Sequence, residues 1–202
     1  MSPRPDAEIE SGWQGEIRGL DEAVYLAVAR TPTPRLDAAM RRLTNAANYS
    51  RLSMASAALL ALAGGDRGRR AAASGLATVG LTSAFVNLAV KPLVRRRRPA
   101  RETHEAARTR NVHMPASRSF PSGHTAAAFA FATAVGRDLP LAGVPLRGMA
   151  ALVGYSRVHT GVHFPGDVIA GALIGAMIAD VTADAVDTAV NCTSTRLSSR
   201  SS

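Results

Sequence analysis

The stretch AAASGLATVGLTSAFVNLAVKPLV, residues 71–94, is the clearest apolar run of the chain, and it decides the fold. It is rich in Ala, Gly, Leu and Val. A helix needs roughly 20 residues to cross the hydrocarbon core of a bilayer. The run has 24 residues, which exceeds that length, and it predicts a membrane-spanning helix from Ala71 to Val94.

Four further apolar runs are shorter or carry a charge, such as Arg147 within the third of them. They cover Leu52–Gly64, Ser122–Val135, Leu139–Tyr155 and Val168–Val190. In the last run, Gly171 and Gly175 have the spacing that lets two helices approach closely in lipid, although the pattern also fits an ordinary alanine-rich helix. The five runs together predict an all-α fold, a membrane helical bundle of about five or six helices.

The N-terminal part of the chain has a different pattern. Apolar and charged positions alternate at helical spacing on either side of Pro32 and Pro34, which predicts amphipathic helices at the membrane surface or capping the bundle. We expect a flexible segment at 1–19, without a secretory signal peptide, and then a single domain at 20–190. That domain has amphipathic helices at 20–48 and a membrane helical core at 52–190. A disordered tail is expected at 191–202.

The charge of the chain is concentrated in one segment. The 202 residues include 24 Lys and Arg against 15 Asp and Glu, a net charge of +9. Nine of the basic residues and two acidic ones lie between Lys91 and Arg118. Such a balance predicts an anionic partner. Nucleic acid is a poor candidate for this partner. The aromatic content of 4% is low for base stacking, and a nucleic-acid-binding domain would not explain the apolar helices. A lipid or a phosphorylated substrate remains.

The sequence SFPSGHTAAAFAF, residues 119–131, places turn-forming and polar residues at the start of an apolar helix. Ser122 fits the N-cap position, and Gly123 allows an anion to approach the backbone. The first N–H groups of a helix lack internal partners and lie at the positive end of its dipole, so this start can bind phosphate, with His124 beside it. Taken alone, the four residues also fit an ordinary cap with a solvated histidine.

Two other stretches supply complementary groups. The sequence KPLVRRRRP begins at Lys91 and contains Arg98, six residues further on, although a basic flank after a membrane helix is frequent. The sequence YSRVHTGVHFPGDVIAG contains Arg157, His163 and Asp167. Asp167 is expected in the first turn of the last helix, where it can accept a hydrogen bond from His163 and leave the other ring nitrogen free to attack. Cations, backbone donors and two histidines are what phosphoryl transfer requires.

At these residues the chain resembles a known family. The order K-x6-R-P, P-S-G-H and S-R-x5-H-x3-D is similar to the three-part signature of the type 2 phosphatidic acid phosphatase superfamily, which also includes vanadium haloperoxidases and bacterial class A acid phosphatases. Here it reads KPLVRRRRP, PSGH and SRVHTGVHFPGD, with no departure at a signature position. The resemblance covers roughly Leu52 to Asp184.

The resemblance implies an enzyme, a phosphatase that acts on a lipid phosphate. His163 would form a phosphohistidine, Asp167 would orient it, and His124 would protonate the leaving oxygen and then activate water. The phosphate-binding residues would be Lys91, Arg98, Ser122, Gly123 and Arg157. No metal and no other cofactor is expected, because the three cations hold the phosphoryl oxygens. The implied location is the cell membrane, as a multi-pass protein of a bacterial inner membrane.

The signature leaves several questions open, because it recognises phosphate and not the lipid tail. Phosphatidic acid, phosphatidylglycerol phosphate, polyprenyl diphosphate and phosphorylated polyprenyl sugars are all candidate substrates. The mean hydropathy of +0.04 also fits a soluble or peripheral acid phosphatase or haloperoxidase, and a catalytically silent membrane scaffold is a further alternative. The side of the membrane, the oligomeric state and head-group binding by residues 95–97 stay open.

Other polar residues are left outside the predicted site. His159 matches no signature position, and His104 and His113 are expected to be solvated. Asp180, Asp184 and Asp187 share a helical face and could form a metal site. We favour the alternative that they are solvated residues at the far end of the last helix.

Overall fold

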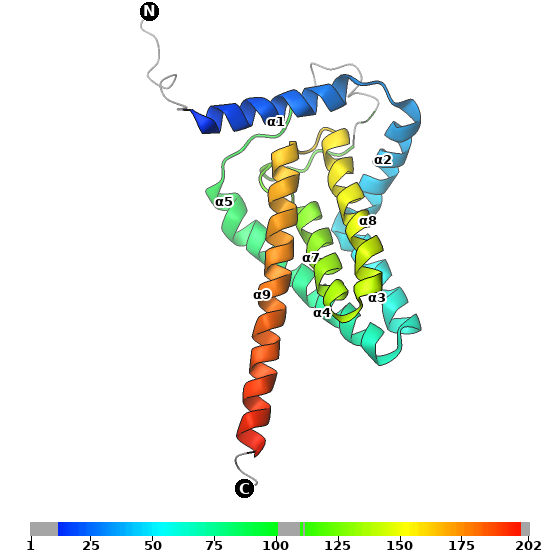
Figure 1. The fold of residues 1–202 in the computed structure, drawn as a ribbon. Helices are drawn as coiled ribbons and strands as arrows, with labels where there is room; N and C mark the ends of the chain where they lie inside the picture. Colours follow the sequence, from blue (N-terminus) through cyan, green and yellow to red (C-terminus); the bar gives the residue numbers. More distant parts are fainter. Residues whose placement is uncertain (1–11, 101–109, 111, 199–202) are drawn as a thin grey trace, which may run out of the picture.

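The computed structural model describes residues 12–100, 110 and 112–198, and every regular element in these ranges is helical. Figure 1 shows a bundle of helices with one helix, α1, lying across one end. Within the described ranges, seven helices have 13 or more residues. The predicted all-α fold is confirmed. The number of helices is slightly above the predicted five or six, because two N-terminal helices add to the five apolar runs.

Each apolar run forms a helix. The five helices are α3 (Arg51–Ala63), α4 (Gly65–Ala84), α7 (Gly123–Asp138), α8 (Pro140–His159) and α9 (Pro165–Ser198). Helix α4 continues through a wider π-type turn at Phe85–Val90 into the short helix α5 (Lys91–Leu93). Such turns occur often at functional sites. Here the turn comes directly before Lys91, a predicted site residue.

The N-terminal region folds as two helices, α1 (Trp13–Arg30) and α2 (Pro34–Ala46), with the break at the predicted prolines. Helix α1 begins inside the segment 1–19 that was predicted to be flexible, and residues 1–11 of that segment lie outside the described residues. At the other end, α9 continues to Ser198, past the predicted start of the tail at 191. Extending an existing helix is favourable because each added residue gains a hydrogen bond without a new nucleation step.

Helix α7 lies at the centre of the bundle and contacts α4, α8 and α9. The closest approach is to α9. A Cβ atom added at Gly171 would lie 2.6 Å from the carbonyl oxygen of Ser122, and one at Gly175 would lie 2.1 Å from that of Ala126. Only glycine fits at these distances, so the small-residue pattern on α9 reflects close helix packing and not alanine richness alone.

Several helices carry large apolar side chains on their outward faces. Two stretches, Gly65–Leu93 and Pro165–Asp184, are long and apolar enough to cross a membrane, each with a mean hydropathy of 1.5. Only 28% and 22% of these windows is buried in the protein, whereas the core helix of a soluble protein would be mostly buried. Helices α3, α7 and α8 do not meet this criterion, so their location in a membrane stays a prediction. Exposed apolar side chains include Leu59, Leu62, Leu81, Leu88, Leu141, Ile169, Leu173 and Met177.

Candidate active site

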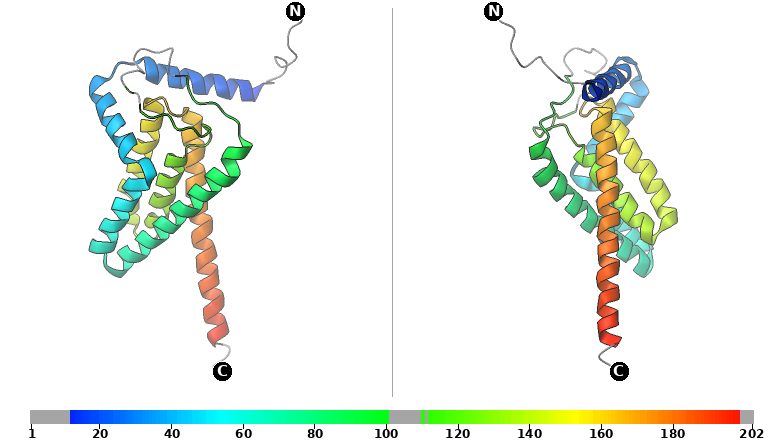
Figure 2. Two further views of the ribbon diagram at one scale, coloured as in Figure 1. Left: turned by 180° about the vertical axis from the view of Figure 1, so that it is seen from behind. Right: turned by 60° about the vertical axis from the view of Figure 1, so that its left-hand side comes forward.

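All eight predicted site residues lie at helix ends or in connecting segments. Figure 2 shows the start of α7, the end of α8 and the start of α9 on the side of the bundle that α1 crosses. Three come from the α7 start, two from the segment around α5, and three from the end of α8 and the start of α9. They are Lys91, Arg98, Ser122, Gly123, His124, Arg157, His163 and Asp167.

His163 lies in the turn between α8 and α9 and is buried, with 2% of its surface exposed. Its Nδ1 atom is 3.5 Å from Oδ2 of Asp167, an ion-pair distance that is long for a hydrogen bond. Its Nε2 atom is 3.2 Å from Nη1 of Arg98. A guanidinium can only donate, so Nε2 accepts, and the ring proton belongs on Nδ1, toward Asp167. In this tautomer the Nε2 lone pair points toward the cations.

Burial lowers the pKa of His163 to about 4, with the positive charge of Arg98 acting in the same direction and Asp167 opposing both. The neutral ring is therefore the stable form near pH 7. A neutral imidazole is the form that can act as a nucleophile.

Asp167 is fully buried in the first turn of α9 and binds several groups that the sequence did not reveal. Its Oδ1 atom accepts a hydrogen bond from Arg96 at 2.9 Å. Its Oδ2 atom accepts from the Ser119 hydroxyl and from the backbone N–H of Phe164, the latter at 3.0 Å. These contacts hold the carboxylate in place beside His163.

Arg96 links Asp167 to α1. Its guanidinium also binds Oδ2 of Asp21, which is buried, and it lies over the ring of Phe164 at 4.4 Å from the centroid. The Oδ1 atom of Asp21 accepts from the backbone N–H of Gly166 at 2.6 Å. The carboxylate at the start of α9 is thus connected to an acidic residue of α1, 146 positions earlier in the chain.

Lys91 and Arg98 share a partner in Ser117. The Nζ atom of Lys91 is 3.3 Å from the Ser117 hydroxyl, and Nη2 of Arg98 is 3.2 Å from the same oxygen. Arg98 also donates to the carbonyl oxygen of Val162 at 2.8 Å. A Cβ atom on Gly123 would lie 3.7 Å from Lys91 Nζ, so this cation lies beside the start of α7.

Ser122 occupies the predicted N-cap position of α7, but its side chain does not cap the helix. Its hydroxyl pairs with that of Thr125 at 2.9 Å. Its backbone N–H donates to the carbonyl oxygen of Asp167 at 2.9 Å, which joins the starts of α7 and α9. Among the described residues no side chain caps this helix start, so its first N–H groups can still bind an anion.

His124 and Arg157 are positioned by the end of α2 and the kink that follows. Nε2 of His124 is 3.1 Å from Oδ1 of Asn48, and Arg157, buried in the last turn of α8, donates to the hydroxyl of Thr44 at 2.8 Å. The backbone turns sharply here, with positive φ angles at Tyr49 and Ser50. Arg157, Lys91 and Arg98 lie close enough to the His124 ring for their positive charges to disfavour its protonated form.

The polar residues left outside the predicted site differ in burial and in their partners. His113 is exposed, as predicted, and His104 lies outside the described residues. His159 is buried against Asp37, away from the phosphate-binding residues. Asp180 and Asp184 pair with Arg137 on the surface, and the described residues contain no group of three or more His, Cys, Asp or Glu suited to a metal ion.

The comparisons with known proteins agree with this arrangement. The profile of the PAP2 superfamily matches residues 71–190, which is more than half of the chain. The chain belongs to the PAP2 superfamily. The resemblance predicted from the three motifs is therefore confirmed, and the matched segment contains all eight predicted site residues.

A curated PAP2 relative is the decaprenylphosphoryl-5-phosphoribose phosphatase of Mycobacterium tuberculosis, which is 40% identical over 89 residues. The match covers 42% of this chain and 45% of that protein, so it spans less than half of the relative's length.

Two solved structures share the fold. Aquifex aeolicus LpxE superposes with a TM-score of 0.64 and 28% identity, covering 82% of this chain and 95% of its own. A transmembrane PAP2-type phosphatidylglycerolphosphate phosphatase from Bacillus subtilis superposes with a TM-score of 0.65 over 90% of both chains. At 24% identity, the second likeness concerns the fold alone.

Proposed function

We propose that this PAP2 protein is a metal-independent phosphatase that hydrolyses a lipid phosphate or diphosphate through a phosphohistidine intermediate. The observation that carries the proposal is a buried neutral histidine whose Nε2 atom faces one cation, with two further cations around the next histidine. The Nε2 atom of His163 faces Arg98 at 3.2 Å, while Lys91 and Arg157 lie around the neighbouring His124. Dense positive charge around a neutral imidazole suits an incoming phosphoryl group.

In the first half of the reaction, Nε2 of His163 attacks phosphorus and the bond from phosphorus to the leaving oxygen breaks. Lys91, Arg98 and Arg157 bind the non-bridging oxygens, together with Ser122 and the N–H of Gly123. Arg98 must turn from Nε2 toward the phosphoryl oxygens when substrate binds. His124 must take up a proton when the anionic substrate binds, and it then donates this proton to the leaving oxygen. Asp167 stabilises the ring of His163 as it becomes cationic.

In the second half, His124 takes a proton from water, and the water oxygen attacks the phosphohistidine. The bond between phosphorus and Nε2 breaks, inorganic phosphate leaves, and His163 returns to its neutral form. No redox change occurs, and each proton taken from one group is given to another. The three cations neutralise the charge that a metal ion neutralises in other phosphatases.

We place the protein in a bacterial inner membrane as a multi-pass protein. The exposed apolar side chains of α4 and α9 support this location, and so does the shared fold with a transmembrane PAP2-type phosphatase. Among the candidate lipids, a polyprenyl-linked substrate receives support from the name of the mycobacterial relative.

The test is phosphate release by the detergent-purified protein in the presence of EDTA. The panel contains phosphatidic acid, phosphatidylglycerol phosphate, undecaprenyl diphosphate, a phosphorylated polyprenyl ribose and a soluble aryl phosphate. Turnover of a lipid in EDTA, lost in His163→Ala, is the expected result. If the soluble ester alone is hydrolysed, the acid-phosphatase alternative is correct. An inactive wild-type protein would support the silent scaffold, and a fully active His163→Ala would exclude His163 as the nucleophile.

A further inference from the structure

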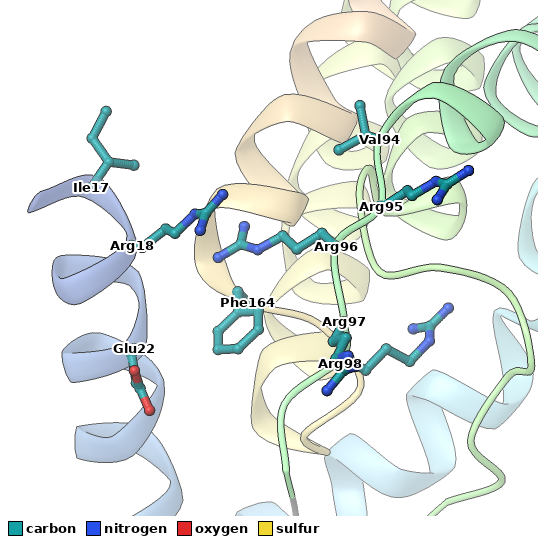
Figure 3. A pocket seen from close by; sticks show the side chains of 9 residues that line it. All are labelled: Ile17, Arg18, Glu22, Val94, Arg95, Arg96, Arg97, Arg98 and Phe164. Atoms are coloured by element: carbon teal, nitrogen blue, oxygen red, sulfur yellow. The ribbon is translucent and has the colours of Figure 1, made fainter. Parts of the chain in front are cut away.

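A pocket of about 800 Å³ lies beside the proposed phosphate site, between α1 and the extended segment 94–98. Figure 3 shows α1 on one side of it and residues 94–98 on the other, with Phe164 between them. A volume of this size is within the range of small-ligand sites. The mechanism proposed above uses none of the α1 side chains that line it.

The pocket adjoins the reacting atoms. Arg98, whose Nη1 is 3.2 Å from the His163 Nε2 atom, is one of its lining residues. Phe164 directly follows His163, and Arg96 binds the carboxylate of Asp167. A group bonded to the leaving oxygen of a phosphoryl group at His163 can therefore extend into this space.

The walls of the pocket are strongly basic. Five of the described residues that line it are arginines, against a single acidic residue, Glu22. In Figure 3 the guanidinium groups of Arg18 and Arg96 point toward each other from opposite walls, whereas Arg95 points away from α1. Arg96 already pairs with Asp21 and Asp167, so the excess positive charge of the walls comes from the other four arginines. This excess favours an anion in the cavity.

The remaining walls are apolar. Ile17 on α1 and Val94 next to α5 line the pocket with Phe164. Beyond the pocket, the outward faces of α5 and α9 continue with exposed apolar side chains at Leu93 and Ile169. A ligand with one negative charge and an adjoining lipid tail matches this combination of arginines and apolar surface.

We infer that this pocket binds a second anionic group, carried by the leaving group of the substrate. The preferred substrates are then lipids in which a phosphodiester lies near the terminal phosphate, and not lipids with an uncharged leaving group such as phosphatidic acid. The inference rests on the proposed function and narrows its substrate class. The selecting side chain of α1, Arg18, lies outside the segment 71–190 that matches the PAP2 profile.

The test compares two lipids with equal acyl chains in neutral detergent micelles. Phosphatidylglycerol phosphate has a phosphodiester in its leaving group, and phosphatidic acid does not. The wild-type protein should prefer the first lipid in kcat/KM. Arg18→Ala should reduce this preference about tenfold, the size of one charge-assisted contact, and Arg18→Lys should restore part of it. The control is Arg30→Ala, which removes an equal charge from an exposed position at the other end of α1 and should leave the preference unchanged.

Two outcomes would overturn the inference. They are an unchanged preference in Arg18→Ala and a wild-type preference for phosphatidic acid.

A binding measurement separates this inference from the proposed function. His163→Ala is titrated with the same two lipids, with and without the Arg18→Ala change. Tighter binding of phosphatidylglycerol phosphate that depends on Arg18 supports the pocket even if the wild-type protein hydrolyses neither lipid. Equal affinities in all variants would reject the pocket even if turnover is observed. Added phosphatidylglycerol, which has the phosphodiester alone, should compete in the presence of Arg18 and compete less in its absence.

Discussion

His159 and His163 are four residues apart, both are buried, and each faces a carboxylate, yet their surroundings differ. Nε2 of His159 is 2.8 Å from Oδ1 of Asp37, and its Nδ1 is 3.3 Å from the hydroxyl of Tyr155. Both ring nitrogens of His159 are therefore bound by the protein. His163 has one nitrogen toward Asp167 and the other toward Arg98, in the group of cations.

The polar groups around His159 bind one another and the neighbouring protein groups. Asp37 also pairs with the buried Arg110 at 2.8 Å and accepts from Thr33 at 2.9 Å. Burial by itself would raise the pKa of Asp37, but the hydrogen bonds from Thr33 and His159 and the charge of Arg110 hold it below its usual value. This cluster fastens α8 to α2. A buried histidine–carboxylate pair therefore does not by itself indicate a reactive histidine. A reactive histidine is indicated when its second ring nitrogen also faces phosphate-binding cations.

The comparison predicts the largest loss of activity at His163. His163→Ala should lower kcat by ~10³-fold or more, because no other group at this position can form the phosphoenzyme. The melting temperature should fall by a few degrees, because the substitution leaves a cavity at a buried position, and this change does not account for the lost activity. Initial rates and thermal unfolding of the detergent-purified variant measure both. Retention of more than a tenth of the activity would contradict the assignment of His163 as the nucleophile.

A smaller loss is expected at Asp21, which reaches His163 indirectly, through Arg96 and through the backbone of Gly166. Asp21→Asn should lower kcat about tenfold with little change in KM, because Asp167 loses part of the support that fixes its position. Asp21→Glu should restore part of the rate.

The control for Asp21 is Glu16→Gln, which removes a charge from an exposed position of the same helix. If Asp21→Asn lowers the melting temperature and leaves kcat unchanged, then Asp21 only fastens α1 to the bundle. The link from α1 to the reacting histidine would then have no catalytic consequence.

His159 should show the opposite behaviour to His163. His159→Ala removes one buried and one partly buried hydrogen bond and leaves a cavity, and it should reduce the free energy of unfolding by about 2–3 kcal/mol. The activity per folded molecule should change less than about threefold, since the cluster does not touch the phosphate-binding residues. Chemical denaturation and active-site-normalised rates test this. A loss of activity as large as that of His163→Ala would remove the distinction between the two histidines.

The smallest expected effect is a pH dependence of stability. The pKa of His163 is lowered to about 4, below the ordinary value near 6.5, so the unfolded chain binds more protons between these values. Wild-type stability should therefore fall, relative to His163→Gln, as the pH decreases from 6.5 toward 4, by up to about 1.4 kcal/mol per pH unit. The melting-temperature difference between the two proteins, measured from pH 7 to pH 5, reports it. His113→Gln, the same substitution at an exposed position, serves as the control.

Much of the fold was predictable because its determinants are local. The lengths of the apolar runs predicted helices α3, α4, α7, α8 and α9, and two prolines marked the break between α1 and α2. The helix bounds at both ends of the chain were not predicted, because composition distinguishes poorly between a polar helix and a flexible segment. Pro165, which begins α9, allowed the correct prediction that Asp167 lies in the first turn of that helix.

The groups that support the site were not predictable in the same way. Arg96 was one of three equivalent arginines until the fold brought it between Asp21 and Asp167, which are far from it in the chain. Thr44 and Asn48 belong to no motif, and they reach Arg157 and His124 only because α2 packs against the end of α8.

The sequence by itself determined the helices, the family signature and the residue types available for phosphate. Those properties follow from short-range spacing and side-chain chemistry. Only the tertiary structure decided that His163 faces cations while His159 is enclosed, and that α1 closes a basic pocket beside the site. Both outcomes depend on contacts between residues far apart in the chain, and such contacts exist only after the helices have packed.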